Sequence, residues 1–204
     1  RPELMLAPFK VEVLSNSVLL TKAKVLLIGP GLGQDKWAQQ IFALAIKHVI
    51  HRNIPCIIDA DALTLLSKTE QYYQNWVLTP HPGEAAKLLH CTIAQIEEDR
   101  FAAAKRIVDK YGGICVLKGA GSLICDGKKI VINSSGNAGM ASGGMGDILA
   151  GVIAALVLQM PHIFEAVKLA VYIHGAAGDN IADKSGQRGM LASDLFIELQ
   201  QMVN

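Results

Sequence analysis

The run Val25-Leu26-Leu27-Ile28-Gly29-Pro30-Gly31-Leu32-Gly33 decides how this chain is expected to fold. Its first four residues are all apolar, which is typical of a strand buried on both faces of a parallel sheet. The glycines and the proline then end the strand. Three further apolar runs end in the same way, in a polar residue or a turn: residues 56–58, 77–78 and 114–117.

Helical patterns alternate with these runs. Apolar residues recur at helical spacing over residues 37–50. Residues 92–111 predict one long amphipathic helix, with a capping box formed by Thr92 and Gln95 and a stop at Gly112. Further helices are expected at 144–159, 162–184 and 193–202. The alternation predicts one α/β domain over residues 1–204, with a mainly parallel sheet.

A local antiparallel element interrupts this alternation. Two short strand-like segments at residues 122–125 and 129–132 are joined by a turn that contains Asp126-Gly127. Such a dipeptide between two strand-like runs predicts a β-hairpin.

Glycine, proline and charged residues gather directly after the predicted strands. In open parallel sheets, ligands bind beyond the carboxyl ends of the strands. Four segments occupy this position: GPGLG (residues 29–33), DAD (residues 59–61), TPHPGE (residues 79–84) and KGAGS (residues 118–122). Their common position predicts a small-molecule site.

The segment GNAGMASGGMGD at residues 136–147 is the densest single signal. Five glycines in eleven residues precede an apolar helix. Such a loop brings backbone N–H groups close to an anion, and the helix N-terminus adds positive potential. Asp147 lies at the mouth of this predicted anion site. Two interpretations stay open for it and are not exclusive: a general base and a helix cap.

Lys118 couples a cation to the glycine turn that follows it. The lysine together with Gly119, Ala120, Gly121 and Ser122 is a candidate phosphate-binding turn. The alternative is an ordinary β-turn beside a solvated lysine.

The segment after the third predicted strand offers two candidate ligand contacts. His81 lies between two prolines, with Pro82 suited to a first helical position, so a ligand role and an N-cap role are both open. Glu84 could hold Mg²⁺ through water or complement the helix N-terminus.

Three further features leave their roles undecided. Asp59 and Asp61 share a face if the segment is extended; they could order a loop, contact sugar hydroxyls or help hold a metal. Gly33 belongs to a backbone wall suited to a flat or phosphorylated ligand. His174 lies among small helical residues, and a core histidine is the favoured interpretation.

Composition removes several classes of function. The net charge of +1 argues against nucleic-acid binding, and a hydrophobic fraction of 51% excludes disorder. No apolar stretch is long enough to span a membrane, and no signal peptide is visible. The four cysteines form no C-x-x-C pair, so we expect small core residues in a reducing cytoplasm.

At this point the motifs resemble those of the ADP-dependent NAD(P)H-hydrate dehydratase family, a carbohydrate-kinase-like domain often fused behind an NAD(P)H-hydrate epimerase domain. The resemblance covers residues 25–204. It rests on IGPGLGQD, DADAL, LTPHPGEAAKLL, VLKGAGS, GNAGMASGGMGDILAG, IHGAAGD and RGMLASDL.

The resemblance implies a ribokinase-like three-layer α/β/α fold and a lyase that repairs nicotinamide nucleotides. Hydrated NADH or NADPH is dehydrated with ADP, giving NAD(P)H, AMP and phosphate, and Mg²⁺ is implied as a cofactor. The residues implied for ADP are Lys118, Gly119, Ala120, Gly121, Ser122 and Gly146. Those implied for the hydrated cofactor are Gly33, His81 and Asp147, with Asp147 as catalytic base; Glu84 is the candidate metal contact.

The family also sets expectations for the wider assembly. A homo-oligomer is implied, and an epimerase is a possible fused or functional partner. The family's N-terminal strand–helix unit is expected to be absent from these 204 residues. A ribokinase-like small-molecule kinase and a non-catalytic nucleotide-binding module are the alternative functions.

Overall fold

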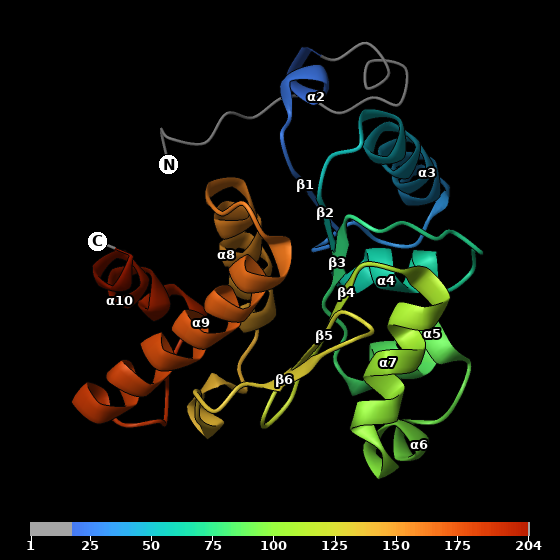
Figure 1. Ribbon diagram of the computed structural model, residues 1–204. Coiled ribbons are helices and arrows are strands. Elements are labelled where there is room, and N and C mark those ends of the chain that lie inside the picture. Colours follow the sequence, from blue (N-terminus) through green and yellow to red (C-terminus); the bar gives the residue numbers. More distant parts are fainter. Residues whose placement is uncertain (1–17, 204) are drawn as a thin grey trace.

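The structure, a computed structural model, describes residues 18–203 (Figure 1). Its elements in chain order are α2 (Val18–Lys22), β1 (Leu26–Ile28), α3 (Lys36–Arg52), β2 (Cys56–Ile58), α4 (Ala60–Leu66), β3 (Trp76–Leu78), α5 (Pro82–Leu89), α6 (Ile93–Glu98), α7 (Arg100–Tyr111), β4 (Ile114–Leu117), β5 (Leu123–Cys125), β6 (Ile130–Ile132), η1 (Ala138–Met140), α8 (Met145–Gln159), α9 (Ile163–Ser185), η2 (Ala192–Asp194) and α10 (Leu195–Met202).

The six strands form one sheet in the order β1-β2-β3-β4-β5-β6. Strands β1 to β4 are parallel, and β5 and β6 continue the sheet as an antiparallel hairpin. The hairpin turn is fixed by Asp126, whose carboxylate accepts hydrogen bonds from the N–H groups of Lys128 and Lys129. The predicted mainly parallel sheet with a local hairpin is therefore confirmed.

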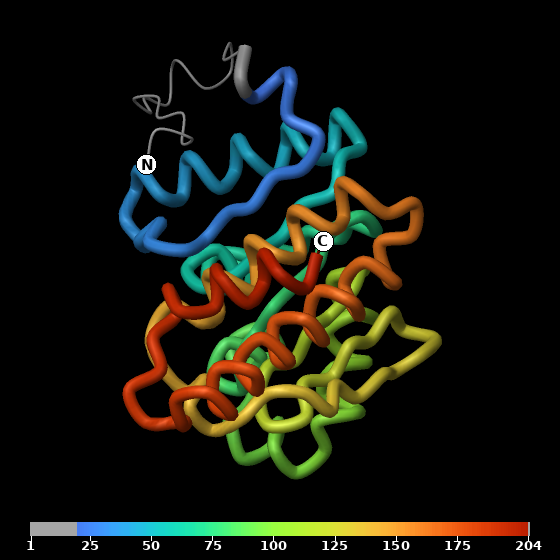
Figure 2. The backbone as a smooth tube through the Cα atoms, turned by 90° about the vertical axis from the view of Figure 1, so that its left-hand side faces the viewer, coloured from blue at the N-terminus to red at the C-terminus, as the bar shows by residue number. Residues whose placement is uncertain are grey.

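Helices cover both faces of the sheet, so the molecule has three layers. Alternate strand residues point to opposite sides: Ile58 packs in the core under α3 to α7, whereas Ile57 packs in the core under α8, α9 and α10. Figure 1 shows these two helical layers on either side of the strands. In the second layer α9 contacts both α8 and α10 (Figure 2).

The predicted single helix over residues 92–111 is wrong, because the chain breaks at Asp99. This residue has non-helical backbone angles, and its side chain accepts a hydrogen bond from the N–H of Ala102. It therefore caps a new helix, α7. The predicted capping box of Thr92 and Gln95 is present at the start of α6.

Asp59 and Asp61 do not lie together on an extended segment, which was the condition for their sharing a face. Asp59 is the N-cap of the short helix α4, and Asp61 lies in its first turn. The two carboxylates therefore have different partners, as described below.

The cysteines behave as core residues. Cys56, Cys115 and Cys125 are buried, and all four thiols are free. Burial raises the pKa of the Cys56 and Cys115 thiols, so both stay protonated. Among the described residues, no helix has the length and apolar content needed to cross a bilayer.

Candidate functional site

A cavity of about 850 Å³ lies beyond the carboxyl end of β4. Its wall brings together three segments that are far apart in sequence: the turn at residues 118–122, the loop at 133–142 and the start of α8. Side chains of α9 close its far side, and His81 lies at its edge. This volume is within the range of pockets that enclose a small ligand.

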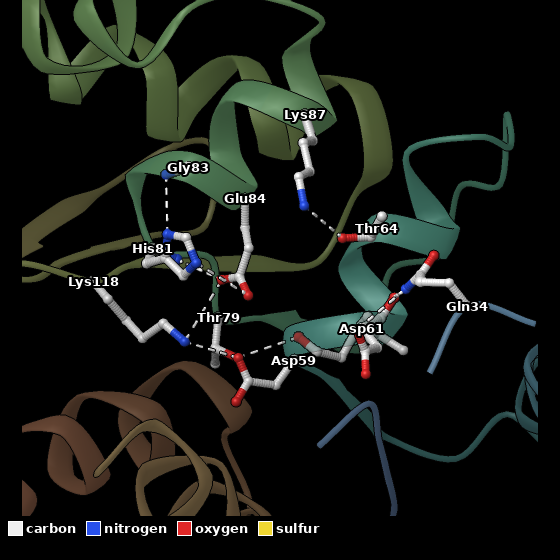
Figure 3. A network of polar contacts seen from close by, with 11 residues as sticks. Gln34, Asp59, Asp61, Thr64, Thr79, His81, Gly83, Glu84, Lys87 and Lys118 are labelled. Carbon is white, nitrogen blue, oxygen red and sulfur yellow. Dashed lines mark hydrogen bonds and ion pairs between the residues drawn. The ribbon is translucent and has the colours of Figure 1, made fainter. Parts of the chain in front are cut away.

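Lys118 is held in an ion pair rather than free in solvent. Its Nζ lies 2.9 Å from Oδ1 of Asp59 and 3.8 Å from Oε2 of Glu84 (Figure 3). Asp59 is only 1% exposed, so its carboxylate depends on this cation. One lysine thus faces two carboxylates, so this group of three side chains carries no net positive charge.

His81 and Glu84 form a capping box at the start of α5. Nδ1 of His81 accepts from the N–H of Gly83, and the N–H of His81 donates to Oε2 of Glu84. Because Nδ1 is an acceptor, the proton of the neutral imidazole is on Nε2, which lies 3.5 Å from Oε1 of Glu84. The His81 side chain is 57% exposed, so its ring stays accessible from the cavity edge.

The glycine-rich loop is held by helix α9. The carboxylate of Asp179 accepts from the N–H of Gly136 at 2.8 Å and from Nδ2 of Asn137 at 2.9 Å. Gly175 lets the loop approach closely, since a Cβ there would lie 2.3 Å from Oγ of Ser135. Sequence reasoning missed Asp179, although the motif IHGAAGD that contains it was part of the resemblance.

His174 is a core histidine, as predicted. Its Nε2 lies 3.0 Å from the carbonyl oxygen of Met145, to which the ring N–H donates. Burial lowers the pKa of His174 from 6.5 to about 4, so the ring is neutral at pH 7. It also lines the cavity, where it fixes the first residue of α8.

Asp147 follows the cavity residue Gly146 in the first turn of α8. Its side chain is exposed and makes no hydrogen bond or ion pair within residues 18–203. The N-cap of α8 is Gly144, so Asp147 is not a hydrogen-bonding cap. Its carboxylate is therefore unpaired, and Asp147 itself is not among the residues that line the cavity.

Gly33 lies outside the cavity wall. Its N–H donates to Oδ2 of Asp61 at 2.8 Å, and Gln34 Nε2 bonds the same residue. Of the roles left open for Asp61, ordering a loop is therefore the one observed. A Cβ at Gly33 would meet nothing within 4 Å, so its outer face is open.

The acidic side chains do not build a protein cage for a metal. Between residues 18 and 203, no three His, Cys, Asp or Glu side chains are placed to hold an ion together. The carboxylates near the cavity, Asp59 and Glu84, are both within 4 Å of Lys118.

Known proteins resemble this chain over most of its length. A family model described as NAD(P)H-hydrate dehydratase matches residues 1–201. The chain is 48% identical over 205 positions to the bifunctional NAD(P)H-hydrate repair enzyme Nnr of Escherichia coli (strain K12), covering 100% of this chain and 39% of that protein. It is 37% identical to the ADP-dependent (S)-NAD(P)H-hydrate dehydratase of Neisseria meningitidis serogroup B, covering 95% and 69%. The chain thus spans about two fifths of the length of the first relative.

Solved structures show the same fold. The Bacillus subtilis ADP/ATP-dependent NAD(P)H-hydrate dehydratase, co-crystallised with ATP and Mg²⁺ and soaked with CoA, superposes with a TM-score of 0.78 at 31% identity, covering 88% of this chain and 65% of that one. Hydroxyethylthiazole kinase from Pyrococcus horikoshii gives 0.75 at 18% identity, covering 93% and 75%, and shows the fold alone. The ribokinase-like fold implied by the motifs is confirmed.

Proposed function

This chain belongs to the NAD(P)H-hydrate dehydratase family, and from that membership we propose that it is a hydro-lyase that dehydrates hydrated NADH and NADPH with ADP. The products are NAD(P)H, AMP and phosphate. The observation that carries the proposal is the cavity beside β4. Its wall contains two glycine-rich segments and the N-terminus of α8, and Asp147 follows a wall residue with its carboxylate unpaired.

ADP is assigned to the cavity. Its phosphates would lie on the turn from Lys118 to Ser122 and near Gly146, at the N-terminal end of α8. Backbone N–H groups and the helix dipole both favour negative charge there. A Cβ at Gly146 would lie 3.3 Å from Nζ of Lys118, so the lysine and the start of α8 border the same space.

The hydrated cofactor is assigned to Gly33 and to His81, which lines the cavity. His81 presents an exposed ring on a backbone fixed by Pro82 and by the capping box. Gly33 presents an open backbone face, which Asp61 holds in place. These features support a rigid surface for the nicotinamide end of the substrate.

Asp147 acts as general base on the hydroxyl of the hydrated ring. It takes the hydroxyl proton as the oxygen attacks the terminal phosphorus of ADP, and AMP leaves. The ring nitrogen lone pair then expels phosphate, and loss of a ring proton restores the double bond. Phosphorylation is needed because hydroxide is a poor leaving group and phosphate is a good one.

Mg²⁺ fits this site as an ion that arrives with the nucleotide. Such an ion keeps several waters and needs only one or two carboxylates besides phosphate oxygens. Glu84 and Asp59 provide two carboxylates, and Lys118 is one positive charge. One negative charge is therefore left that a bound cation would neutralise. When bound, the ion would supply charge neutralisation between the phosphates and these carboxylates.

We extend the proposal to the protein's setting. Three buried free cysteines support a reducing cytoplasm. Exposed apolar side chains on the outer layer, Leu191, Phe196 and Ile197, support a homo-oligomer. Residues 1–204 are proposed to act as one dehydratase domain beside an NAD(P)H-hydrate epimerase, fused or separate.

The reaction itself is the test. Purified protein is mixed with hydrated NADH or hydrated NADPH, ADP and Mg²⁺, and the reduced-nicotinamide absorbance and AMP are followed together. We expect both to rise in a one-to-one ratio. Formation of a stable phosphorylated product without reduced nicotinamide would contradict the dehydratase and favour a kinase.

A further inference from the structure

The turn after β4 presents backbone donors to the cavity. Gly119, Ala120 and Gly121 line its wall. Their three N–H groups make no hydrogen bond to any residue that the structure describes. Unpartnered amides on a glycine turn form an anion-binding concavity.

Arg100, the first residue of α7, lies behind this turn and outside the cavity wall. Its Nη1 donates to the carbonyl oxygen of Ala120 at 2.8 Å, and its Nη2 lies 3.4 Å from the carbonyl oxygens of Leu117 and Lys118. One guanidinium therefore binds three carbonyls of the turn. In a trans peptide the N–H points away from the carbonyl, so the carbonyls of Lys118 and Ala120 that face Arg100 direct the N–H groups of Gly119 and Gly121 away from the arginine. The third carbonyl, that of Leu117, belongs to the peptide of Lys118, whose N–H donates to the carbonyl oxygen of Pro80.

Gly119 is adapted to this arrangement. A Cβ at this position would lie 2.8 Å from Nη2 of Arg100, and its φ of +146° is one that other residues rarely adopt. The φ of Gly119 therefore favours glycine at this position, and a side chain there would also displace the Arg100 guanidinium.

The two positive charges near the turn, on Lys118 and Arg100, differ in whether a carboxylate pairs with them. Lys118 is matched by Asp59 and faces Glu84 as well. Arg100 makes no ion pair with the carboxylates of residues 18–203: its Nη1 and Nη2 groups donate to carbonyls, and its buried Nε has no hydrogen-bond partner there. The uncompensated positive charge at this end of the cavity is therefore that of Arg100.

We propose that Arg100 is the positioning residue of the nucleotide-binding turn: it orients the amides of Gly119 and Gly121 toward the phosphates and supplies positive potential that Lys118, which faces two carboxylates, does not. This inference rests on the assignment of ADP to the cavity. Arg100 acts through the backbone and does not touch the nucleotide.

The test compares Arg100→Gln and Arg100→Lys with the matched control Arg106→Gln, an exposed arginine of the same helix. ADP affinity is measured by calorimetry, and KM is measured separately for ADP and for the hydrate. Arg100→Gln should weaken ADP binding about 10- to 100-fold, the scale of hydrogen bonds from a charged donor. The ADP affinity of Arg100→Lys should lie between those of Arg100→Gln and the wild type, because lysine keeps the positive charge but lacks the planar pair of guanidinium N–H donors.

A second measurement separates positioning from mere stability. In the ADP-bound protein, amide hydrogen exchange at Gly119 and Gly121 should be faster in Arg100→Gln than in the wild type, and KM for ADP should rise more than KM for the hydrate. Equal rises in both KM values with a lowered melting temperature, or unchanged ADP affinity, would overturn the proposal. If Arg100→Gln does not fold, wild-type affinity and exchange in Arg100→Lys would overturn it.

The proposed function fails differently. A wild-type protein that binds no ADP contradicts the assignment of the cavity. A wild type that binds ADP and turns over, beside an Arg100→Gln variant with the same affinity, contradicts only the role of Arg100.

Discussion

The ion pair between Lys118 and Asp59 links the candidate site to folding stability. Asp59 is 1% exposed, and its carboxylate accepts a hydrogen bond from the lysine. The sequence indicated a cation after β4, but not its partner, which lies 59 residues earlier. Pairing over that distance depends on the register of three strands and has no local signal.

Replacing Lys118 alone should therefore harm folding as well as binding. Lys118→Met leaves a buried carboxylate unpaired, which costs about 3–5 kcal/mol. The double variant Asp59→Asn with Lys118→Met removes that charge and should recover most of the loss in urea unfolding. ADP affinity should stay weaker in both by about 1–3 kcal/mol, measured by calorimetry. Equal stabilities of the single and double variants would contradict the coupling.

Asp147 is the residue on which the proposed chemistry depends most. Asp147→Asn keeps the size of the side chain but cannot take a proton, so turnover should fall at least ~10²-fold. ADP affinity should hold or improve, since a negative charge near the phosphates is gone. Steady-state kinetics with calorimetry check both. Near-wild-type turnover would exclude Asp147 as base, whereas lost ADP binding would assign it to the nucleotide.

At the scale of elements, apolar periodicity located the strands and the long helices but not two local helix starts. The pattern over residues 92–111 continues across Asp99, whose capping bond to Ala102 nevertheless begins a new helix. Helix α4 starts directly after β2, and its first residue, Ala60, has a φ of +48°. The sequence Asp-Ala-Asp gives no signal for this left-handed conformation. Both misses occur where one side chain or one backbone angle overrides periodicity.

The contact between α8 and α9 gives stability a pH dependence through His174. Its pKa is about 4 in the folded protein, against an ordinary value of 6.5, because burial disfavours the charged ring. Between these two pH values the unfolded chain binds a proton that the folded chain does not. The free energy of unfolding should therefore fall as pH decreases from 6.5 to 4, by about 3 kcal/mol from this group.

His174→Gln isolates that contribution. The glutamine amide can donate to the carbonyl of Met145 but does not titrate in this range. Urea unfolding of both proteins at pH 7 and pH 4 should show the wild type losing more stability than the variant. The same pH dependence in both would show that His174 is not the responsible group.

At the scale of the whole molecule, the cavity joins parts of the chain that fold into different layers. The turn at residues 118–122 connects β4 to β5 of the sheet, α8 and α9 belong to one helical layer, and His81 caps the first helix turn of α5 in the other. The order of these segments along the strand ends follows from parallel topology, which is why the sequence predicted that they meet. The supports behind them, Arg100 and Asp179, come from helices and could not be read from strand-end positions.

A ligand that binds in this cavity should raise the free energy of unfolding of the whole domain. ADP that binds only the folded state adds about 2.7 kcal/mol at a concentration 100 times its Kd. For a domain of this size, that corresponds to a rise in melting temperature of roughly 5–10 °C. Scanning calorimetry with ADP should show this rise. Amide exchange should slow at residues 119–121 and 136–146, yet stay unchanged in α3, which lines no part of the cavity. A rise in melting temperature accompanied by protection in α3 but not in those two segments would move the nucleotide to another site, since binding slows exchange first where the ligand makes its contacts.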